Sequence, residues 1–283
     1  MAEYYSIVAD EKEIKRFFQS ALNTGLKDCE SYMLSLSCRH KKLTEEQRQT
    51  LGVGRSEMIR TTIRRRHSDG LSFQAFKESV YAYECRKEGL LTKKGFPYPE
   101  EGLVLYLYLN PCSDLDCLDD TVNYILQRKS EMINHVVKQN DSYVKESLYK
   151  LSIAFDHYKS CHAQHPSRKV LIDFDLDVDF EESNEKEAIQ AIRDCTETFF
   201  NKGSFWLVRT SGGIHIVVRS SELKFNPTDY TKALTEVAWK KSYGQIKECI
   251  YNKNCMIPLP GTFQYGKPVY VLNWDDFESE ESL

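Results

Sequence analysis

The chain has 283 residues, of which 41% are hydrophobic and 28% charged, and a formal net charge of −4 at pH 7. This composition is typical of a globular protein with one large domain or two interlocked ones, and the negative charge excludes attraction of nucleic acid to the whole surface. The first thirty residues lack the apolar core of a signal peptide, and no run approaches the ~18 apolar residues of a membrane span. Nine cysteines without regular spacing are therefore expected to be free thiols in a reducing, intracellular compartment.

The first half of the chain predicts an α/β unit. Hydrophobic periodicity predicts helices over 11–24, 72–88 and 119–160 and strands over 32–37 and 103–110. The last helical stretch is expected to be two helices that meet near Asn140 and Asp141. The aromatic-rich strand is expected to be buried and to end at Pro111.

A basic stretch lies in this first half. Between Arg39 and Arg66, nine basic residues face three acidic ones, although the whole chain is acidic. Such a patch suits a phosphate backbone, and a solvated helix surface would explain it equally well. The residues expected to contact nucleic acid are Arg39, Lys41, Lys42, Arg64, Arg65 and Arg66.

The second half alternates strands and helices. Strand patterns cover 170–180, 205–209, 214–219 and 269–272, and helical patterns cover 183–200 and a segment beginning at 226–227. A tight hairpin turn is expected between the second and third strands, at Thr210, Ser211, Gly212 and Gly213. This β-α-β-β-α-β-like order predicts a compact split βαβ module.

The first strand of this module carries an aspartate at every second position. Alternate side chains of a strand share a face, which predicts a common direction for Asp173, Asp175, Asp177 and Asp179. Carboxylates this close repel one another, and a hard divalent cation such as Mg²⁺ removes that penalty by binding their oxygens. The pattern favours a metal-dependent enzyme over an exposed strand end or a structural cation site.

Three segments follow one another in a recognisable order. Leu171–Asp175 reads apolar-apolar-Asp-apolar-Asp, and Ser211–His215 is a small-residue turn that ends in histidine. Gly261 and Thr262 are then followed by Lys267. In this order the segments resemble the motifs of the archaeo-eukaryotic primase superfamily, over residues 165–275.

The resemblance implies a primase or primase-polymerase-like nucleotidyltransferase that joins nucleotides on a DNA template and releases pyrophosphate by two-metal catalysis. Asp173 and Asp175 would bind two Mg²⁺ or Mn²⁺ ions, and His215 would donate to the triphosphate. The nucleotide phosphates would also contact Arg209, Ser211, Gly212, Gly213 and Lys267. Partners would be the DNA template, nucleoside triphosphates, and a separate helicase or other replication protein for unwinding.

Two positions depart from the family pattern. Counted back from the Gly261–Thr262 pair, the third carboxylate falls near Lys247 or Glu248, so Glu248 is the candidate. The alternatives are Asp177, Asp179, Asp275 and Asp276. Two residues before the histidine, where the family often has serine, this chain has Gly213.

The expected fold is α+β, with an RRM-like split βαβ catalytic module packed against an N-terminal α/β unit. Residues 1–160 would form the accessory unit with the basic patch, and residues 161–283 the metal-dependent module with an acidic tail. Two other functions stay open: a non-polymerising primase-fold protein that binds nucleic acid or nucleotide as a replication factor, and a metal-dependent nuclease or phosphohydrolase.

Zinc is a second metal to consider. Cys161, His162 and His165 lie close together in the chain, and Cys112 and Cys117 could add thiolates. The spacing fits no standard zinc finger, and intracellular cysteines are mostly buried small hydrophobes. We therefore favour Mg²⁺ or Mn²⁺ over zinc.

Overall fold

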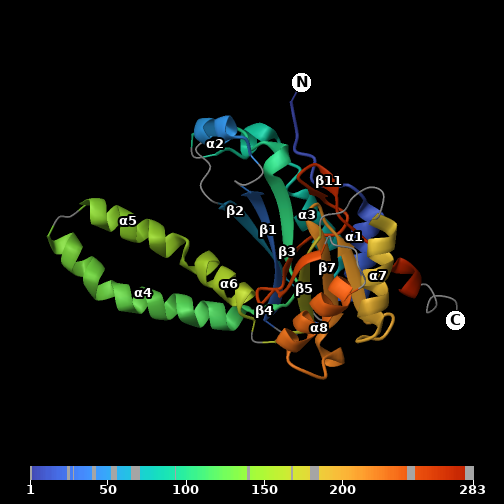
Figure 1. Ribbon diagram of the computed structural model, residues 1–283. Helices are drawn as coiled ribbons and strands as arrows, with labels where there is room; N and C mark the ends of the chain where they lie inside the picture. Colours follow the sequence, from blue (N-terminus) through green and yellow to red (C-terminus); the bar gives the residue numbers. More distant parts are fainter. Residues whose placement is uncertain are drawn as a thin grey trace.

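In the computed structural model, the described residues are 2–23, 26–27, 29–39, 43–51, 56–64, 71–92, 94–138, 141–166, 168–178, 185–240 and 246–277. They form a mixed α+β fold with two antiparallel sheets, which confirms the predicted α+β class (Figure 1). Among these residues, no helix is long and apolar enough to cross a membrane.

The helices are α1 (Glu11–Phe17), which continues into the π-helical turn η1 (Phe18–Leu22), α2 (Glu45–Leu51), α3 (Phe73–Tyr81), α4 (Asp114–Val137), α5 (Asp141–Ser152), α6 (Ala154–Gln164), α7 (Glu185–Glu197) and α8 (Pro227–Lys240). The strands are β1 (Glu30–Arg39), β2 (Ser56–Arg64), β3 (Leu103–Tyr108), β4 (Cys112–Ser113), β5 (Leu171–Val178), β6 (Phe205–Arg209), β7 (Gly213–Arg219), β8 (Ile246–Tyr251), β9 (Met256–Pro258), β10 (Phe263–Gln264), β11 (Lys267–Pro268) and β12 (Tyr270–Val271). Short 3₁₀ turns are η4 (Lys87–Gly89), η5 (Glu100–Gly102), η6 (Ser220–Glu222) and η7 (Trp274–Phe277).

The first sheet has the order β11-β10-β3-β1-β2, and β4 pairs with β1 while β9 pairs with β3. Both β1 and β3 are buried along almost their whole length, because elements cover the sheet on both faces. Leu34 and Leu105 belong to the core shared with Phe17 of α1 and Phe76 of α3. The predicted buried strand over 103–110 is thereby confirmed.

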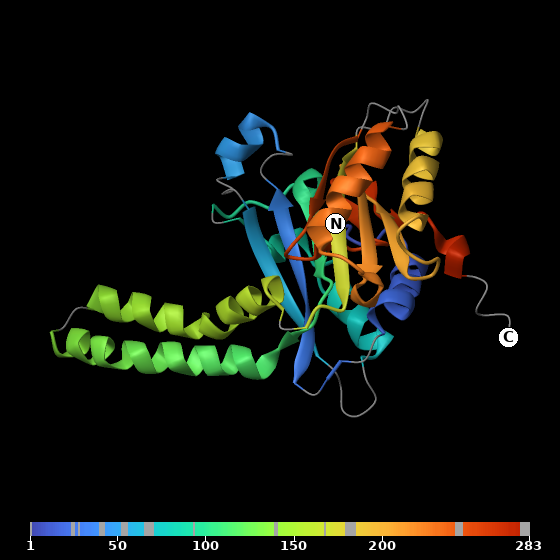
Figure 2. The same cartoon turned by 60° about the horizontal axis from the view of Figure 1, so that its bottom comes forward.

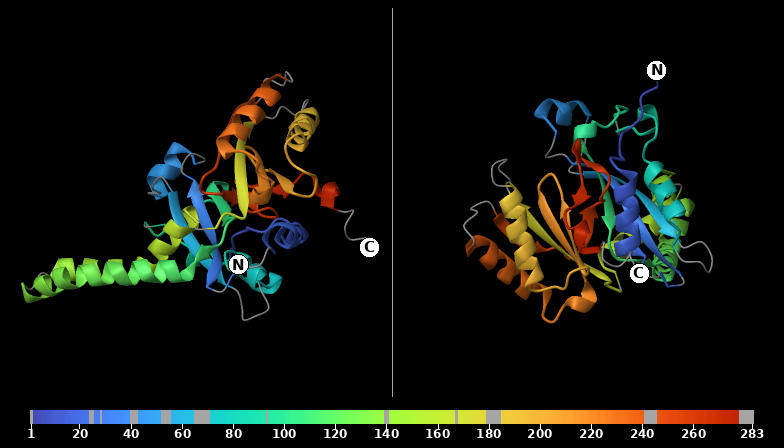
Figure 3. Two further views of the ribbon diagram at one scale, coloured as in Figure 1. Left: turned by 90° about the horizontal axis from the view of Figure 1, so that it is seen from below. Right: turned by 90° about the vertical axis from the view of Figure 1, so that its right-hand side faces the viewer.

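The second sheet has the order β12-β6-β7-β5-β8, and all its pairs are antiparallel. Its elements follow one another as β5-α7-β6-β7-α8-β8. Figure 3 shows α7 and α8 side by side on one face of this sheet. Phe174 and Ile216 pack beneath these helices against Ile192 of α7 and Leu234 of α8. The last strand of the series is β8, whereas the sequence pattern had placed it over 269–272, where the structure has β12.

The chain after β8 connects the two sheets. Strands β9 and β10 pair with β3 of the first sheet, and β12 then pairs with β6 of the second. Leu171, Trp206 and Val217 of the second sheet share one hydrophobic core with the first sheet. The predicted division of the chain into residues 1–160 and 161–283 stays a prediction. Strands β9–β11 belong to the second of these segments in the sequence, yet they are part of the first sheet.

Helices α4, α5 and α6 form a long arm that projects from the two sheets (Figure 2). Helix α4 begins at Asp114, earlier than predicted, because the Ser113 hydroxyl accepts a hydrogen bond of 3.1 Å from the backbone N–H of Asp116. At the base of the arm the fully buried ammonium of Lys159 contacts the Asp114 carboxylate and the Ser31 hydroxyl. A buried charge needs such partners, so this cluster attaches the arm to β1.

Candidate active site

The aspartates of β5 lie on the face opposite the helices. Ile172, Phe174 and Leu176 are in the core beneath α7 and α8, so the alternating aspartates face the other way. Asp173 is fully buried, the side chain of Asp175 is 50% exposed, and Asp177 is exposed. Burial therefore decreases along the strand toward its end. Asp179 lies outside the described residues.

Asp173 holds His215 of the neighbouring strand β7. Nδ1 of His215 lies 3.1 Å from both carboxylate oxygens of Asp173, and Asn252 Nδ2 donates to Oδ2 at 2.6 Å. Nε2 of His215 lies 3.8 Å from Oδ1 of Asp175. The imidazole is thus fixed with one nitrogen on a buried carboxylate and the other toward Asp175.

The electrostatics of this pair favour a charged imidazole. Burial alone would lower the pKa of His215 because it disfavours the cation. The charge of Asp173, its hydrogen bond and the charge of Asp175 outweigh burial and raise the pKa of His215 to about 9. At neutral pH both ring nitrogens then carry protons, so His215 can donate to Asp173 and to an anionic ligand together.

The turn from Thr210 to Gly213 brings backbone against β5. A Cβ on Gly213 would lie 1.9 Å from the carbonyl oxygen of Leu176, so only glycine fits. The backbone at Gly213 therefore lies directly against β5. The backbone N–H of Ser211 donates to Oε1 of Gln264 at 2.7 Å, while the Ser211 Oγ is buried and has no hydrogen-bond partner among the described residues.

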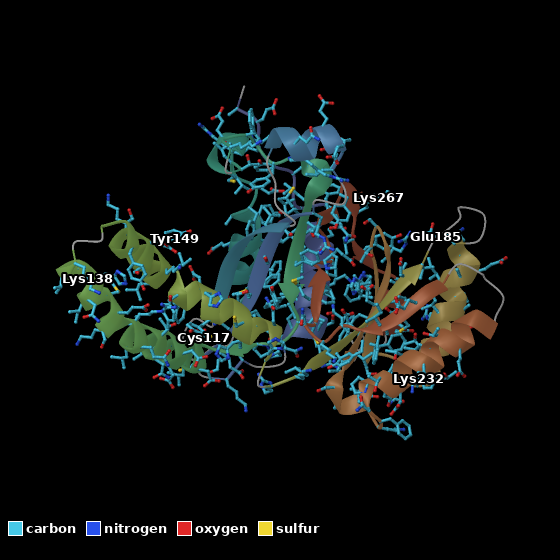
Figure 4. The ribbon with its side chains drawn as sticks, turned by 60° about the vertical axis from the view of Figure 1, so that its left-hand side comes forward. Cys117, Lys138, Tyr149, Glu185, Lys232 and Lys267 are labelled. Atoms are coloured by element: carbon cyan, nitrogen blue, oxygen red, sulfur yellow. The ribbon has the colours of Figure 1, made fainter. Side chains whose placement is uncertain are left out.

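Two predicted phosphate contacts do not lie at this face. Arg209 belongs to the helix-covered side of β6, where its Nε donates to Glu185 at 3.0 Å and its Nη1 to the carbonyl oxygen of Gly213 at 3.3 Å. Figure 4 labels Glu185, at the start of α7, and Lys267. Lys267 is exposed in β11. Arg209 therefore stabilises the Thr210–Gly213 turn from the helix-covered side of the sheet.

A cavity of about 610 Å³ lies between the two sheets. The second sheet and its turns contribute Asp175, Asp177, Thr210, Ser211, Gly212, His215, Glu248, Ile250, Tyr251, Asn252, Lys253 and Asn254. The side of the first sheet contributes Arg39, Tyr106, Met256, Pro258, Gln264 and Tyr265. Of the predicted site residues, the cavity brings together Asp175, Ser211, Gly212, His215, Glu248 and Arg39. Asp173, Arg209, Gly213 and Lys267 do not line it.

Glu248 reaches the cavity because β8 pairs with β5. Its Cα partner is Asp177, and directly opposite residues of a pair have their side chains on the same face. Three carboxylates, those of Asp175, Asp177 and Glu248, therefore line one side of the cavity.

The opposite wall carries a basic and aromatic group. Nη1 of Arg39 donates to the Tyr106 hydroxyl at 3.2 Å, and Tyr265 is hydrogen-bonded to Tyr106. Tyr265 has a φ of +55° and precedes Gly266 with a φ of +74°, so a bulky residue occupies a turn position that favours glycine or asparagine. The motifs pointed to neither Tyr265 nor Asn252. The adjoining Gly266 indicates a turn, although nothing local indicates that this turn reaches the aspartate strand.

The other predicted nucleic-acid contacts do not belong to the described side chains. Lys41, Lys42, Arg65 and Arg66 lie outside the described residues. Arg64 is the last residue of β2, and its side chain is not described. Arg39 is thus the member of the basic stretch whose position bears on the cavity.

The donor set suits a hard cation better than zinc. Carboxylate oxygens of Asp175, Asp177 and Glu248 are the ligands that Mg²⁺ and Mn²⁺ prefer. As the side chains lie, no group of three or more His, Cys, Asp or Glu in the described part of the chain is arranged to hold a metal ion. In the cysteine–histidine segment, Nε2 of His162 lies 2.9 Å from Asp120, and Cys161 is exposed on α6.

Comparisons with known proteins found no matching family model, no matching curated protein and no matching solved structure. The resemblance to the primase superfamily therefore depends on the motifs of the sequence and on the arrangement of their residues around the cavity.

Proposed function

We propose that the chain is a primase or primase-polymerase-like nucleotidyltransferase that uses Mg²⁺ or Mn²⁺. The observation that carries the proposal is the convergence of one carboxylate face, a histidine held by a buried aspartate and a serine–glycine turn on a single cavity. These groups come from two motifs that are separate in the sequence, and they have the chemistry that a nucleoside triphosphate with its metal ions requires.

The topology supports an RRM-like split βαβ module as the catalytic unit. The elements β5-α7-β6-β7-α8-β8 occur in the order of that module, and the strands lie in the sheet as β8-β5-β7-β6. In this order β5 and β7 are the two central strands. Residues on their helix-free face, such as Asp175 and His215, are Cα partners and can act on one ligand.

The metal ions would be held by Asp175 together with Asp177 and Glu248. Bound there, the ions would lower the pKa of the primer 3′-hydroxyl and neutralise charge on the triphosphate. Asp173 as a metal ligand stays a prediction, since its oxygens are hydrogen-bonded to His215 and Asn252. In this arrangement Asp173 acts by keeping His215 charged and oriented.

The nucleotide phosphates would lie against the turn and the histidine. Ser211 Oγ is a buried hydroxyl with no hydrogen-bond partner in the described part of the chain, and a phosphate oxygen would satisfy it. The Nε2 proton of His215 would donate to the same group, since this nitrogen is turned away from Asp173. Donors fixed before the reaction stabilise the charge that builds on the leaving pyrophosphate.

The template and the sugar would meet the opposite wall. Arg39 carries a charge suited to a phosphate backbone, and Tyr106 and Tyr265 offer aromatic and hydroxyl groups beside it. The strained backbone of Tyr265 is consistent with a functional position, because such strain is often found at binding sites.

The test is incorporation of labelled nucleotides opposite a defined template, with Mg²⁺ or Mn²⁺. We expect incorporation that follows the template base, and a loss of roughly a hundredfold or more in the Asp175→Asn variant. Asp156→Asn, an exposed position on α6, is the matched control and should retain activity. Equal incorporation by the wild type and Asp175→Asn would contradict the proposal.

Two other results would replace it with a different function. Metal-dependent shortening of the nucleic acid, lost in Asp175→Asn, would indicate a nuclease. Binding of nucleotide or DNA that is unaffected by a chelator, without synthesis under either metal, would indicate a non-polymerising replication factor.

A further inference from the structure

Helix α4 exposes a mostly apolar stripe along the projecting arm, with Lys129 as its one charged residue. The stripe follows alternating steps of three and four residues, Leu115, Leu118, Val122, Ile125, Lys129, Met132 and Val136. Leu115 is 55% exposed, Leu118 48% and Val136 57%. This spacing is that of a coiled-coil seam, and monomers rarely expose an apolar patch of more than a few hundred Å².

The stripe is separate from the contacts that hold the arm together. Toward α5 and α6, α4 presents Cys117 and Thr121, which are buried, and Tyr124, whose ring centroid lies 6.1 Å from that of Tyr158. Nearer the tip, His135 stacks on Tyr143 with 3.6 Å between ring centroids. The exposed stripe lies about 100° around the helix from this inner face, so the packing of α5 and α6 against α4 leaves the stripe uncovered.

The outer half of the stripe borders a groove of about 350 Å³ between α4 and α5. Its walls are almost wholly apolar and include Met132, Ile133, Val137 and Leu151. Figure 4 shows this part of the arm, between the labelled Lys138 and Tyr149, well away from the two sheets. A side chain from another helix could insert there as a knob between these residues.

We propose that this stripe pairs with the same stripe of a second copy of the chain, in antiparallel orientation. The charges of α4 are divided unevenly: Asp116, Asp119 and Asp120 lie near its start, whereas the second half carries Lys129 and an Arg128–Glu131 ion pair of 2.6 Å. An antiparallel pair places the acidic start of each helix beside Lys129 of the other, which makes the surface self-complementary.

Lys129 selects the orientation because it is the one charged residue of the seam. In a parallel pair the two Lys129 ammonium groups would face each other, which is unfavourable. In the antiparallel register that sets Val122 opposite Ile125, Lys129 lies opposite Leu118 and beside Asp119 of the second copy. A single lysine at such a position is known to determine the register of paired helices.

The test is the mass of the full chain in solution, measured by sedimentation over a range of concentrations. We expect a reversible species of twice the 33.0 kDa chain mass. Ile125→Asp should raise the dimer dissociation constant about tenfold or more. Gln127→Asp, on the exposed polar face of the same helix, should not change it.

A charge exchange tests the orientation without changing the apolar seam. Lys129→Asp and Asp119→Lys should each weaken the dimer, and the two changes together in one chain should restore it. A wild type that is monomeric at every concentration, or one that assembles only with a different protein, would overturn the proposal. So would a dimer that Ile125→Asp leaves unchanged. None of these outcomes depends on nucleotide chemistry, so this inference and the proposed function can fail separately.

Discussion

Replacing Asp173 with asparagine removes the charge that holds His215 in its protonated form. The two residues are buried, and Nδ1 of His215 lies 3.1 Å from each Asp173 oxygen. Burial lowers the pKa of His215, but the charge and hydrogen bond of Asp173 and the charge of Asp175 outweigh it and raise this pKa from its ordinary value of 6.5 to about 9. In Asp173→Asn only Asp175, at 3.8 Å, remains to oppose burial. We therefore expect the pKa of His215 to fall below 6.5.

The corresponding free energy is roughly 3 kcal/mol, at ~1.4 kcal/mol for each tenfold change in proton affinity. Its sign follows from the raised pKa of the folded state. The stabilisation is fully present below the unfolded pKa of 6.5 and is lost as pH rises through about 9. Asp173→Asn should therefore lose more stability at pH 6 than at pH 10.

The assay is NMR titration of the histidine ring protons in the presence of a chelator. A His215→Gln variant assigns the resonance among the seven histidines of the chain. An unchanged pKa of His215 in Asp173→Asn would refute the role given to Asp173. So would a pKa near 6.5 in the wild type.

Four further substitutions, one of them a control, test other parts of the account. Gly213→Ala should destabilise the protein by roughly 3 kcal/mol, because the added methyl would meet the Leu176 carbonyl, whereas Gly212→Ala has nothing within 4 Å and should be tolerated. Denaturant unfolding measures both, and equal midpoints would contradict the close approach. Ser211→Ala should weaken binding of a nucleoside triphosphate about tenfold in calorimetry, through loss of one buried hydrogen bond, with no change in folding. Asn110→Ala should lower the free energy of unfolding by roughly 2–4 kcal/mol, because the Asn110 side chain makes three hydrogen bonds of 2.6–2.9 Å to the backbone where β5 begins. A loss below roughly 0.5 kcal/mol would show that the start of β5 does not depend on these hydrogen bonds.

The sequence predicted the parts of the site that depend on local pattern. The aspartate face of β5 follows from alternation alone, and the hairpin before His215 follows from its glycines. The same alternation could have placed Arg209 on the helix side, because Phe205 and Leu207 of that strand belong to the helix-covered core. The motif assigned it to the phosphates instead, without reference to the strand's faces.

Other parts depend on contacts between distant segments. β8 is a short edge strand with two charged residues, so its sequence has only a weak strand pattern. It forms a strand because it pairs with β5. Tyr265 reaches the cavity because the chain after β8 crosses to the first sheet and returns. Neither the crossing nor the wall that it builds has a local signal in the sequence.

The central claim is that the cavity between the sheets binds metal ions and a nucleoside triphosphate together. The most direct measurement is the anomalous scattering of Mn²⁺ in crystals of the protein soaked with Mn²⁺ and a non-hydrolysable nucleoside triphosphate. The account predicts a Mn²⁺ peak bound by Asp175 and a second carboxylate of that face, with the triphosphate against Ser211 and His215. A cavity that contains neither metal nor nucleotide at saturating concentrations, or a Mn²⁺ peak elsewhere that leaves Asp175 unbound, would contradict it.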